Sequence, residues 1–300
     1  MTEEELILQD RLGVIRSVNE KYNLDENSYL SFSGGKDSTL LSALLDMAIP
    51  NNNIPRVFID TGIEYNAIRA FVLDKADKDK RFHILKPTKP IKAVLEQYGY
   101  PFKSKQHSHN LMVYQHSGIG LSIKRYLGII ESNTLFRCPS NLMYQFTADF
   151  SLKCSDQCCL RLKKKPVKKW EKENNRHIAI TGMRKAEGGE RASLKGCVLT
   201  DESGNLKKFH PLLVVADEWE DWFVREYNIE LCELYKEPFN FKRTGCKGCP
   251  FSLDLQEQLS TMELYMPAER KQCEIIWKPV YDEYRRIGYR LKKYEQIKIV

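Results

Sequence analysis

The chain has 300 residues, of which 42% are hydrophobic and 29% are charged, a balance typical of globular proteins and too apolar for a disordered chain. At about 150 residues per domain, this length predicts two domains. The 47 basic and 40 acidic residues leave a net charge of +7, and no apolar run approaches the roughly 18 residues of a spanning helix, which excludes an integral membrane protein. The acidic start, MTEEELILQD, lacks the basic and apolar regions of a signal peptide, so we expect a cytoplasmic protein.

Strands and helices are predicted to alternate over the first hundred residues. Short apolar runs predict strands at 29–32, 56–59 and 82–85, and helical patterns predict helices at 39–48, 64–78 and 90–98. A fourth strand is predicted at 177–181. Strands that alternate with helices at this pitch favour a doubly wound, mainly parallel α/β sheet.

The later segments read mostly as helices. Helical patterns cover 111–127, 160–173, 216–227, 253–266 and 267–287, and residues 183–210 are expected to form a loop or a hairpin. We therefore predict two domains. Residues 1–215 form a nucleotide-binding α/β domain with a cysteine-bearing insertion, and residues 216–300 form a helical C-terminal subdomain that completes a metal site.

A glycine-rich turn follows the first predicted strand and opens the first predicted helix. It reads Ser33-Gly34-Gly35-Lys36-Asp37-Ser38. Ligands of open α/β sheets bind at the carboxyl ends of the strands, where glycines admit backbone N–H groups close to an anion and the helix start adds partial positive charge. The serine hydroxyls and Lys36 add donors, so the turn predicts a phosphate site, although it is not a Walker A loop.

The turn resembles the PP-loop of ATP pyrophosphatase-type enzymes, in the branch that contains phosphoadenosine phosphosulfate (PAPS) and adenosine phosphosulfate (APS) reductases. Residues 58–65, FIDTGIEY, are similar to that branch's F-x-D-T-G-x-E-Y segment. Thr181-Gly182-Met183-Arg184, followed by Glu187 and Arg191, is similar to its T-G-x-R loop, and His210-Pro211-Leu212 to its H-P-L segment. The resemblance covers residues 28–250.

The resemblance implies roles for particular residues. The turn at 33–38 would hold nucleotide phosphates, Asp60 and Thr61 would lie beside the adenosine, and Gly182 would belong to the same site. Arg184 and Arg191 would reach the anionic group, which suits the planar donor fork of arginine. The candidate catalytic residues are Lys36, Asp37, Arg184, Arg191 and Cys154.

Two close cysteine pairs predict a metal site. Cys158-Cys159 and the C-x-x-C of Cys246 and Cys249 are separated by 86 residues, and four thiolates can enclose zinc or a [4Fe–4S] cluster. The chemistry alone does not separate these two. A Cys-Cys pair followed by basic residues and a proline resembles the iron–sulfur APS reductases, which implies a [4Fe–4S] cluster. Cys154 is the candidate reactive thiol, with a pKa that Lys153 or the basic helix could depress.

One family motif is missing. Assimilatory sulfonucleotide reductases carry a nucleophilic cysteine in a C-terminal E-C-G-L-H motif, whereas the last cysteine of this chain, Cys273, lies inside a predicted helix. The relatives that make DNA phosphorothioates combine a PP-loop domain with an iron–sulfur cluster, as this chain does by resemblance. We therefore hold three hypotheses: ATP- and Mg²⁺-dependent sulfur transfer to a nucleic acid or small molecule, APS or PAPS reduction with another thiol, and a non-catalytic nucleotide-binding partner protein.

Two groups of basic residues suggest anionic partners. Residues 161–176 hold eight basic and two acidic residues, which suits a nucleic acid partner or a solvated helix face. Lys103, Lys105 and His107 could contact a substrate phosphate or lie on a solvated loop. The resemblance also implies a sulfur donor or a thiol reductant protein, and no feature suggests a membrane partner.

Overall fold

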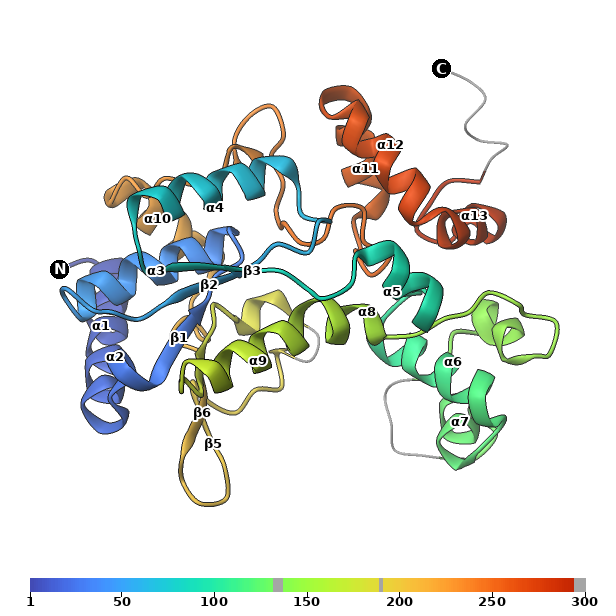
Figure 1. Cartoon of the computed structure of the whole chain (residues 1–300), viewed down its shortest axis with the longest axis horizontal. Coiled ribbons are helices and arrows are strands. Elements are labelled where there is room, and N and C mark those ends of the chain that lie inside the picture. The colour runs from blue at the N-terminus through green and yellow to red at the C-terminus, as the bar shows by residue number, and fades with distance from the viewer. Residues whose placement is uncertain (132–136, 189–190, 294–300) are drawn as a thin grey trace. The chain divides into compact units, whose positions relative to one another are not determined.

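The computed structural model describes residues 1–131, 137–188 and 191–293 and divides into two compact units (Figure 1). Unit 1 comprises the described residues of 1–60, 64–86 and 166–245. Unit 2 comprises those of 61–63, 87–165 and 246–293. This grouping differs from the predicted division at residues 215 and 216, which stays a prediction.

Unit 1 contains a six-stranded sheet in the order β3-β2-β1-β4-β6-β5, with every neighbouring pair parallel except β5 and β6. This confirms the predicted mainly parallel α/β fold, and the four predicted strands lie within one or two residues of those observed. The strands are β1 (Ser28–Ser31), β2 (Arg56–Ile59), β3 (Phe82–Leu85), β4 (Ile178–Ile180), β5 (Val198–Thr200) and β6 (Leu206–Phe209).

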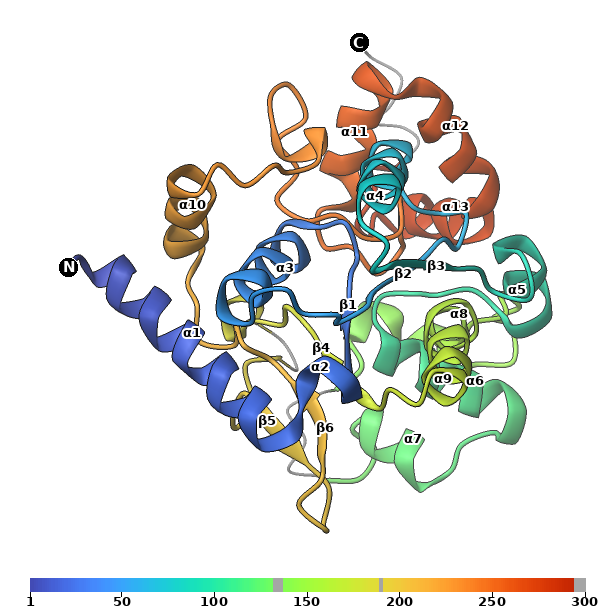
Figure 2. The same cartoon turned by 60° about the vertical axis from the view of Figure 1, so that its left-hand side comes forward.

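Helices cover both faces of this sheet. Figures 1 and 2 show α3 and α4 on one face and α9 on the other. On the α9 face the rings of Tyr29 and Trp170 meet edge to face, with centroids 5.5 Å apart, and Val57 packs beside them. The described helices of unit 1 are α1 (Glu3–Tyr22), α2 (Leu24–Asn27), α3 (Lys36–Ala48), α4 (Asn66–Lys78), α9 (Lys165–Glu173), α10 (Asp217–Glu226) and the 3₁₀ turns η3 (Lys185–Glu187) and η5 (Glu233–Tyr235).

The described part of unit 2 is helical. It contains α5 (Ile91–Tyr98), α6 (Lys105–Ser117), α7 (Leu121–Tyr126), the 3₁₀ helix η1 (Ser140–Phe146), α8 (Gln157–Cys159), the π-helical turn η2 (Leu160–Lys164), α11 (Leu255–Tyr265), α12 (Pro267–Ile276) and α13 (Lys278–Ile287).

Three predicted helices are interrupted. The prediction at 111–127 is wrong in its continuity, because α6 ends at Ser117, just before Gly118, whose φ of +71° ends a helix readily. The prediction at 267–287 breaks at Trp277, just before Pro279. The prediction at 160–173 contains the π turn η2 before α9. Within the described residues, none of the helices has both the length and the apolar character to cross a membrane.

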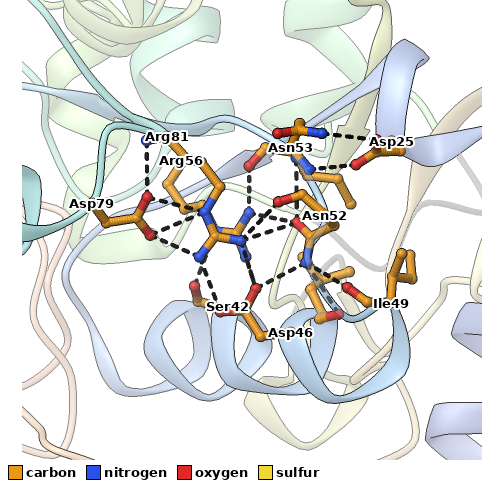
Figure 3. Close-up of polar contacts among 11 residues, drawn as sticks. Asp25, Ser42, Asp46, Ile49, Asn52, Asn53, Arg56, Asp79 and Arg81 are labelled. Carbon is orange, nitrogen blue, oxygen red and sulfur yellow. Dashed lines mark hydrogen bonds and ion pairs between the residues drawn. The ribbon is translucent and has the colours of Figure 1, made fainter.

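An ionic network joins α3 to the amino ends of β2 and β3 in unit 1 (Figure 3). The fully buried guanidinium of Arg56 lies 2.7 Å from Asp46, and Arg81 reaches the same carboxylate at 2.7 Å. Asn52 accepts a hydrogen bond from Arg56 at 2.8 Å, and Asp79 pairs with Arg81 at 2.8 Å. The network lies at the end of the strands opposite the glycine-rich turn, so we infer that it stabilises the fold of unit 1.

Candidate functional site

The glycine-rich turn runs from the end of β1 to the start of α3. Gly34 has a φ of +74°, and a Cβ there would lie 2.9 Å from methyl groups of Ile68 and Val72, so both the backbone and the space require glycine. The Ser33 and Ser38 hydroxyls lie 3.1 Å apart, and Ser38 donates to the Gly35 carbonyl at 3.0 Å. These bonds fix a turn whose N–H groups lie at a helix start, as anion binding requires.

Gly182 brings the segment after β4 against this turn. A Cβ on Gly182 would lie 2.9 Å from the Asp37 Cβ and 3.0 Å from its backbone carbonyl carbon. The missing side chain therefore allows the two backbones to approach, and two residues later Arg184 reaches Asp37, with Nε 2.9 Å from Oδ1. The sequence placed these residues in one site by resemblance, and unit 1 brings them together.

Acidic residues of α10 pair with both cations. The Lys36 ammonium lies 3.3 Å from Glu220 and 3.1 Å from Asp221. Arg184 lies 2.6 Å from Asp217 and 3.1 Å from Glu220. Burial lowers the pKa of Lys36, but the carboxylates outweigh it and leave the pKa above its usual value. Both cations therefore stay charged.

Glu220 is the fully buried member of this group. Burial, followed by the charge of Asp37, raises the pKa of Glu220 to about 8, although Arg184 and Lys36 oppose the shift. Its ion pairs lack the angles of hydrogen bonds, so its two carboxylate oxygens have no hydrogen-bond partner. A buried carboxylate without hydrogen bonds is costly to ionise, which agrees with the raised pKa.

A second cationic group lies nearby. Glu187 pairs with both Arg191 and Arg243, and its other oxygen accepts from the Arg184 backbone N–H at 3.2 Å. Burial lowers the pKa of Arg191, and neighbouring Arg184 lowers it further, whereas Asp37 opposes the shift. Arginine remains charged despite such shifts.

These groups line one cavity of about 680 Å³ in unit 1. Its volume is in the range of sites for small molecules and cofactors. Its wall is mainly polar and charged: Ser33, Gly35, Lys36, Asp37, Arg184, Ala186, Glu187, Arg191, Asp217, Asp221, Tyr235, Lys242, Arg243 and Thr244. A cavity with these donors is suited to a phosphorylated ligand.

Sequence reasoning missed several of these residues. The α10 carboxylates read as an ordinary acidic first turn, and a sequence gives no sign that they would pair with cations far along the chain. Tyr235 and Thr244 also lie in the site, with their hydroxyls 2.6 Å apart beside Gly35. One sequence signal for this part of the site was available: Lys242 and Arg243 are adjacent basic residues just before the C-x-x-C.

The predicted adenosine contacts stay predictions. Asp60 follows β2, and its buried carboxylate lies 2.9 Å from the Arg69 guanidinium of α4. Thr61 is buried and belongs to unit 2.

The four predicted metal ligands all belong to unit 2. The Cys158 and Cys159 sulfurs lie 4.0 Å apart. The hydrogen bond to Cys159 and burial raise the pKa of Cys158, and the charges of Cys249 and Cys246 raise it further. The Cys158 thiol, followed by Lys105, Lys163 and Lys164, lowers the pKa of Cys159 to about 6, against the effect of burial. The donor set is chemically right for zinc or iron.

The geometry of a loaded site is not present in the described residues. Across 1–131, 137–188 and 191–293, no three His, Cys, Asp or Glu side chains are arranged to hold a metal ion. None of the nine cysteines, all in these ranges, forms a disulfide. The predicted ligand set therefore stays a prediction.

Helices α12 and α13 hold the C-x-x-C turn by its backbone. Trp277 and Tyr284 donate to the carbonyls of Lys247 and Pro250 at 3.1 and 2.8 Å. Gly248 has a φ of +60°, and a Cβ there would lie 2.8 Å from the Cys273 sulfur. The turn is thus pre-formed, and Cys273 is packed beneath it.

Cys154 is fixed within unit 2. Its backbone bridges to Tyr100, and only 1% of the residue is exposed. Burial, followed by the charge of Glu283, raises the pKa of this thiol, whereas we expected a depressed pKa. Its candidate role stays a prediction.

The prediction for His107 is wrong. The residue is fully buried, and its ring nitrogens bond the Tyr126 hydroxyl at 2.8 Å and the Gln145 amide oxygen at 2.7 Å. It therefore lies inside α6 with both ring nitrogens hydrogen-bonded, and not on a solvated loop. Burial lowers the pKa of His107 to about 4, so the ring is neutral.

The chain is similar in sequence to one family of known proteins. The model of the phosphoadenosine phosphosulfate reductase domain matches residues 27–118 and 123–252. No curated protein matches the chain.

Solved structures with a similar fold share low identity. A PAPS reductase from Candida auris in a phosphate complex is 15% identical, with a TM-score of 0.46, covering 82% of this chain and 96% of that one. An FMN adenylyltransferase from Candida glabrata with FAD and pyrophosphate is 16% identical, with a TM-score of 0.44, covering 82% of this chain and 65% of that one. The U34-tRNA thiolase NcsA from Methanococcus maripaludis with its [4Fe–4S] cluster is 15% identical, with a TM-score of 0.39, covering 95% of this chain and 80% of that one.

Proposed function

Since this chain belongs to the phosphoadenosine phosphosulfate reductase domain family, we propose that it binds ATP in the unit 1 cavity and transfers sulfur to a nucleic acid or small molecule. The observation that carries the proposal is the joint placement of the glycine-rich turn, Lys36 and Arg184 around one cavity. Backbone N–H groups, an ammonium and a guanidinium are the donors that phosphates need.

The proposed reaction has two steps. An oxygen of the acceptor attacks the α-phosphorus of ATP, the α–β bond breaks, and pyrophosphate leaves. A sulfur nucleophile then displaces AMP and takes the place of the oxygen. Lys36 and Arg184 would stabilise the charge that develops on the phosphates, and Asp37 would keep Arg184 in position. Mg²⁺ would enter with the ATP, held mainly by phosphates and water.

The two cysteine pairs, Cys158-Cys159 and Cys246 with Cys249, would hold a [4Fe–4S] cluster. The Cys158 thiol, followed by Lys105, Lys163 and Lys164, lowers the pKa of Cys159, which suits a site that needs deprotonated sulfur ligands. Bound there, the cluster would supply an iron on which sulfur can be carried. The pre-formed C-x-x-C turn lowers the ordering cost of binding.

The basic segment supports a polyanionic acceptor. Within residues 161–176, five basic side chains are exposed: Lys164, Lys165, Lys168, Lys169 and Lys172. Exposed lysines attract a nucleic acid backbone without reading its sequence.

Sulfonucleotide reduction is the second candidate, because family membership favours it directly. Such a reaction needs a thiol that attacks the sulfonate, with sulfite released when a second thiol resolves the product. Cys154 and Cys273 are both buried, with pKa values that burial raises, to about 12 for Cys273. A reductase reaction would thus rely on an external thiol, and this favours ATP-dependent transfer.

Metal analysis and substrate tests separate the candidates. We expect about four irons and four sulfides per chain after purification without oxygen. ATP should then give pyrophosphate, whereas APS and PAPS should give no sulfite. Sulfite release would favour the reductase, and tight nucleotide binding without turnover would favour a partner protein. One zinc and no sulfide would remove the cluster from the proposal.

A substitution tests the cavity itself. Lys36→Ala should lower kcat/KM for ATP by about 100-fold, because one lost donor to a developing charge costs about 3 kcal/mol. Lys75→Ala is the matched control, since Lys75 pairs with Glu230 on the surface of unit 1, away from this cavity. Equal turnover by both variants would refute the assignment of the glycine-rich turn.

A further inference from the structure

The two cations at the α3 end of the cavity are already neutralised. Lys36 and Arg184 face four carboxylates at 2.6 to 3.3 Å: Asp37, Asp217, Glu220 and Asp221. A phosphate that approaches these cations meets a surplus of negative charge. For an anion to bind, some of that charge must move away or be cancelled.

Two of the four carboxylates can move. The side chains of Asp217 and Asp221 are 68% and 59% exposed, whereas that of Asp37 is 32% exposed and keeps Arg184 in position. A change of rotamer can turn such groups into water at small cost. None of the Glu220 side chain is exposed, and Trp219 and Phe223 of the same helix are buried as well.

Glu220 therefore stays beside the cations when Asp217 and Asp221 turn away. It is the one carboxylate of this group that contacts both Lys36 and Arg184. An anion held by these two cations would lie close to it in a water-poor site. Two like charges that share a site raise the pKa of the weaker acid, and protonation is the remaining way to relieve the repulsion.

We propose that Glu220 takes up a proton when an anionic nucleotide binds in the unit 1 cavity, so that binding weakens as the pH rises. This inference rests on the proposed function, because it takes the cavity to be the nucleotide site. Glu220 is a positioning residue, since it acts through Lys36 and Arg184.

The groups around Glu220 determine the pH range over which its carboxyl group ionises. The facing groups are Lys36 and Asp37 of α3, Arg184 after β4, and Asp217 and Asp221 of α10. Helix α1 touches this part of α10 through the backbone carbonyl of Glu4, which accepts from the Trp219 indole at 2.9 Å. The pKa of Glu220 is about 8 before any ligand binds, so its ionisation falls between pH 7 and 9. The last phosphate pKa is about 6, so the phosphates of the ligand change little in charge over this range.

Calorimetric titration of the full chain with magnesium ATP tests the inference. If the bound state keeps Glu220 protonated, Kd should be about tenfold weaker at pH 9 than at pH 7, with close to one proton taken up at pH 9. Two buffers of different ionisation enthalpy report that proton directly. Glu220→Gln should bind with a pH-independent Kd and take up no proton, and Glu218→Gln, an exposed change on the same helix, should keep the wild-type profile.

The outcomes separate the two proposals. ATP binding by the wild type with a constant Kd and no proton uptake overturns this inference alone. Proton uptake that persists in Glu220→Gln also overturns it. No ATP binding at any pH overturns the proposed function. The wild-type proton count does not depend on a variant, so it stands even where Glu220→Gln fails to fold.

Discussion

Gly182→Ala should displace the glycine-rich turn without changing any charge in the site. The added methyl group would lie 2.9 Å from the Asp37 Cβ and 3.0 and 3.1 Å from its carbonyl carbon and oxygen. These contacts are shorter than carbon atoms tolerate, and two of them are to backbone, which no rotamer change can relieve. The segment before Arg184 and the start of α3 must therefore separate.

The expected magnitude follows from this overlap. Overpacking by one methyl group costs about 1–3 kcal/mol, which we expect as a loss in the unfolding free energy of unit 1. When the segment before Arg184 moves away from the start of α3, the ion pair between Asp37 and Arg184 also weakens. Nucleotide affinity should therefore fall at least tenfold, equivalent to about 1.4 kcal/mol.

Urea unfolding and nucleotide titration measure the two effects. Gly196→Ala is the matched control, because a Cβ there meets nothing within 4 Å and its backbone does not require glycine. The reasoning is refuted if Gly182→Ala unfolds and binds nucleotide as Gly196→Ala does.

Two further predictions concern stability. Asp46→Ala should destabilise unit 1 by about 2–4 kcal/mol in urea unfolding, because it removes the ion-pair partner of the buried Arg56. Asp74→Ala breaks only the exposed pair with Lys78 and should cost about 0.3–0.5 kcal/mol, and equal costs would contradict this account. The neutral His107 has a pKa of about 4 when folded and about 6.5 when unfolded, so the unfolded chain binds the extra proton as pH falls. Stability should therefore drop by about 3 kcal/mol from pH 7 to pH 4, and His107→Gln should lose this part of the pH dependence; an unchanged slope in that variant would exclude His107 as its source.

The sequence predicted the features that depend on local pattern. Strands β2 and β3 coincide with the predicted ranges, because apolar runs bounded by polar turns define short buried strands. The glycine-rich turn was located because its residues lie between the first predicted strand and the first predicted helix. Helix α1 was not predicted, although Thr2 and Glu5 form a capping box that the letters T-x-x-E could have signalled.

Features that depend on distant contacts were not predictable. The acidic start of α10 looks like ordinary helix capping until the fold brings Glu220 against Lys36, 184 residues earlier. His107 looks polar and exposed in the sequence, yet two partners with matching hydrogen-bond groups allow its burial. Pairing of this kind is a property of the folded chain.

The chain passes between the two units five times, and the two cysteine pairs lie close to the last two crossings. Cys159 precedes the crossing at residues 165 and 166, and Cys246 is the first residue after the crossing at 245 and 246. Residues 166–245 of unit 1, which include Arg184 and Glu220, therefore lie between the two cysteine pairs in the sequence. A cluster bound by both pairs would close a loop of 86 residues and remove about 4–5 kcal/mol of unfolded-chain entropy, by analogy with a disulfide. Losing the cluster would then lower the unfolding free energy of unit 1 without a change in the contacts inside that unit.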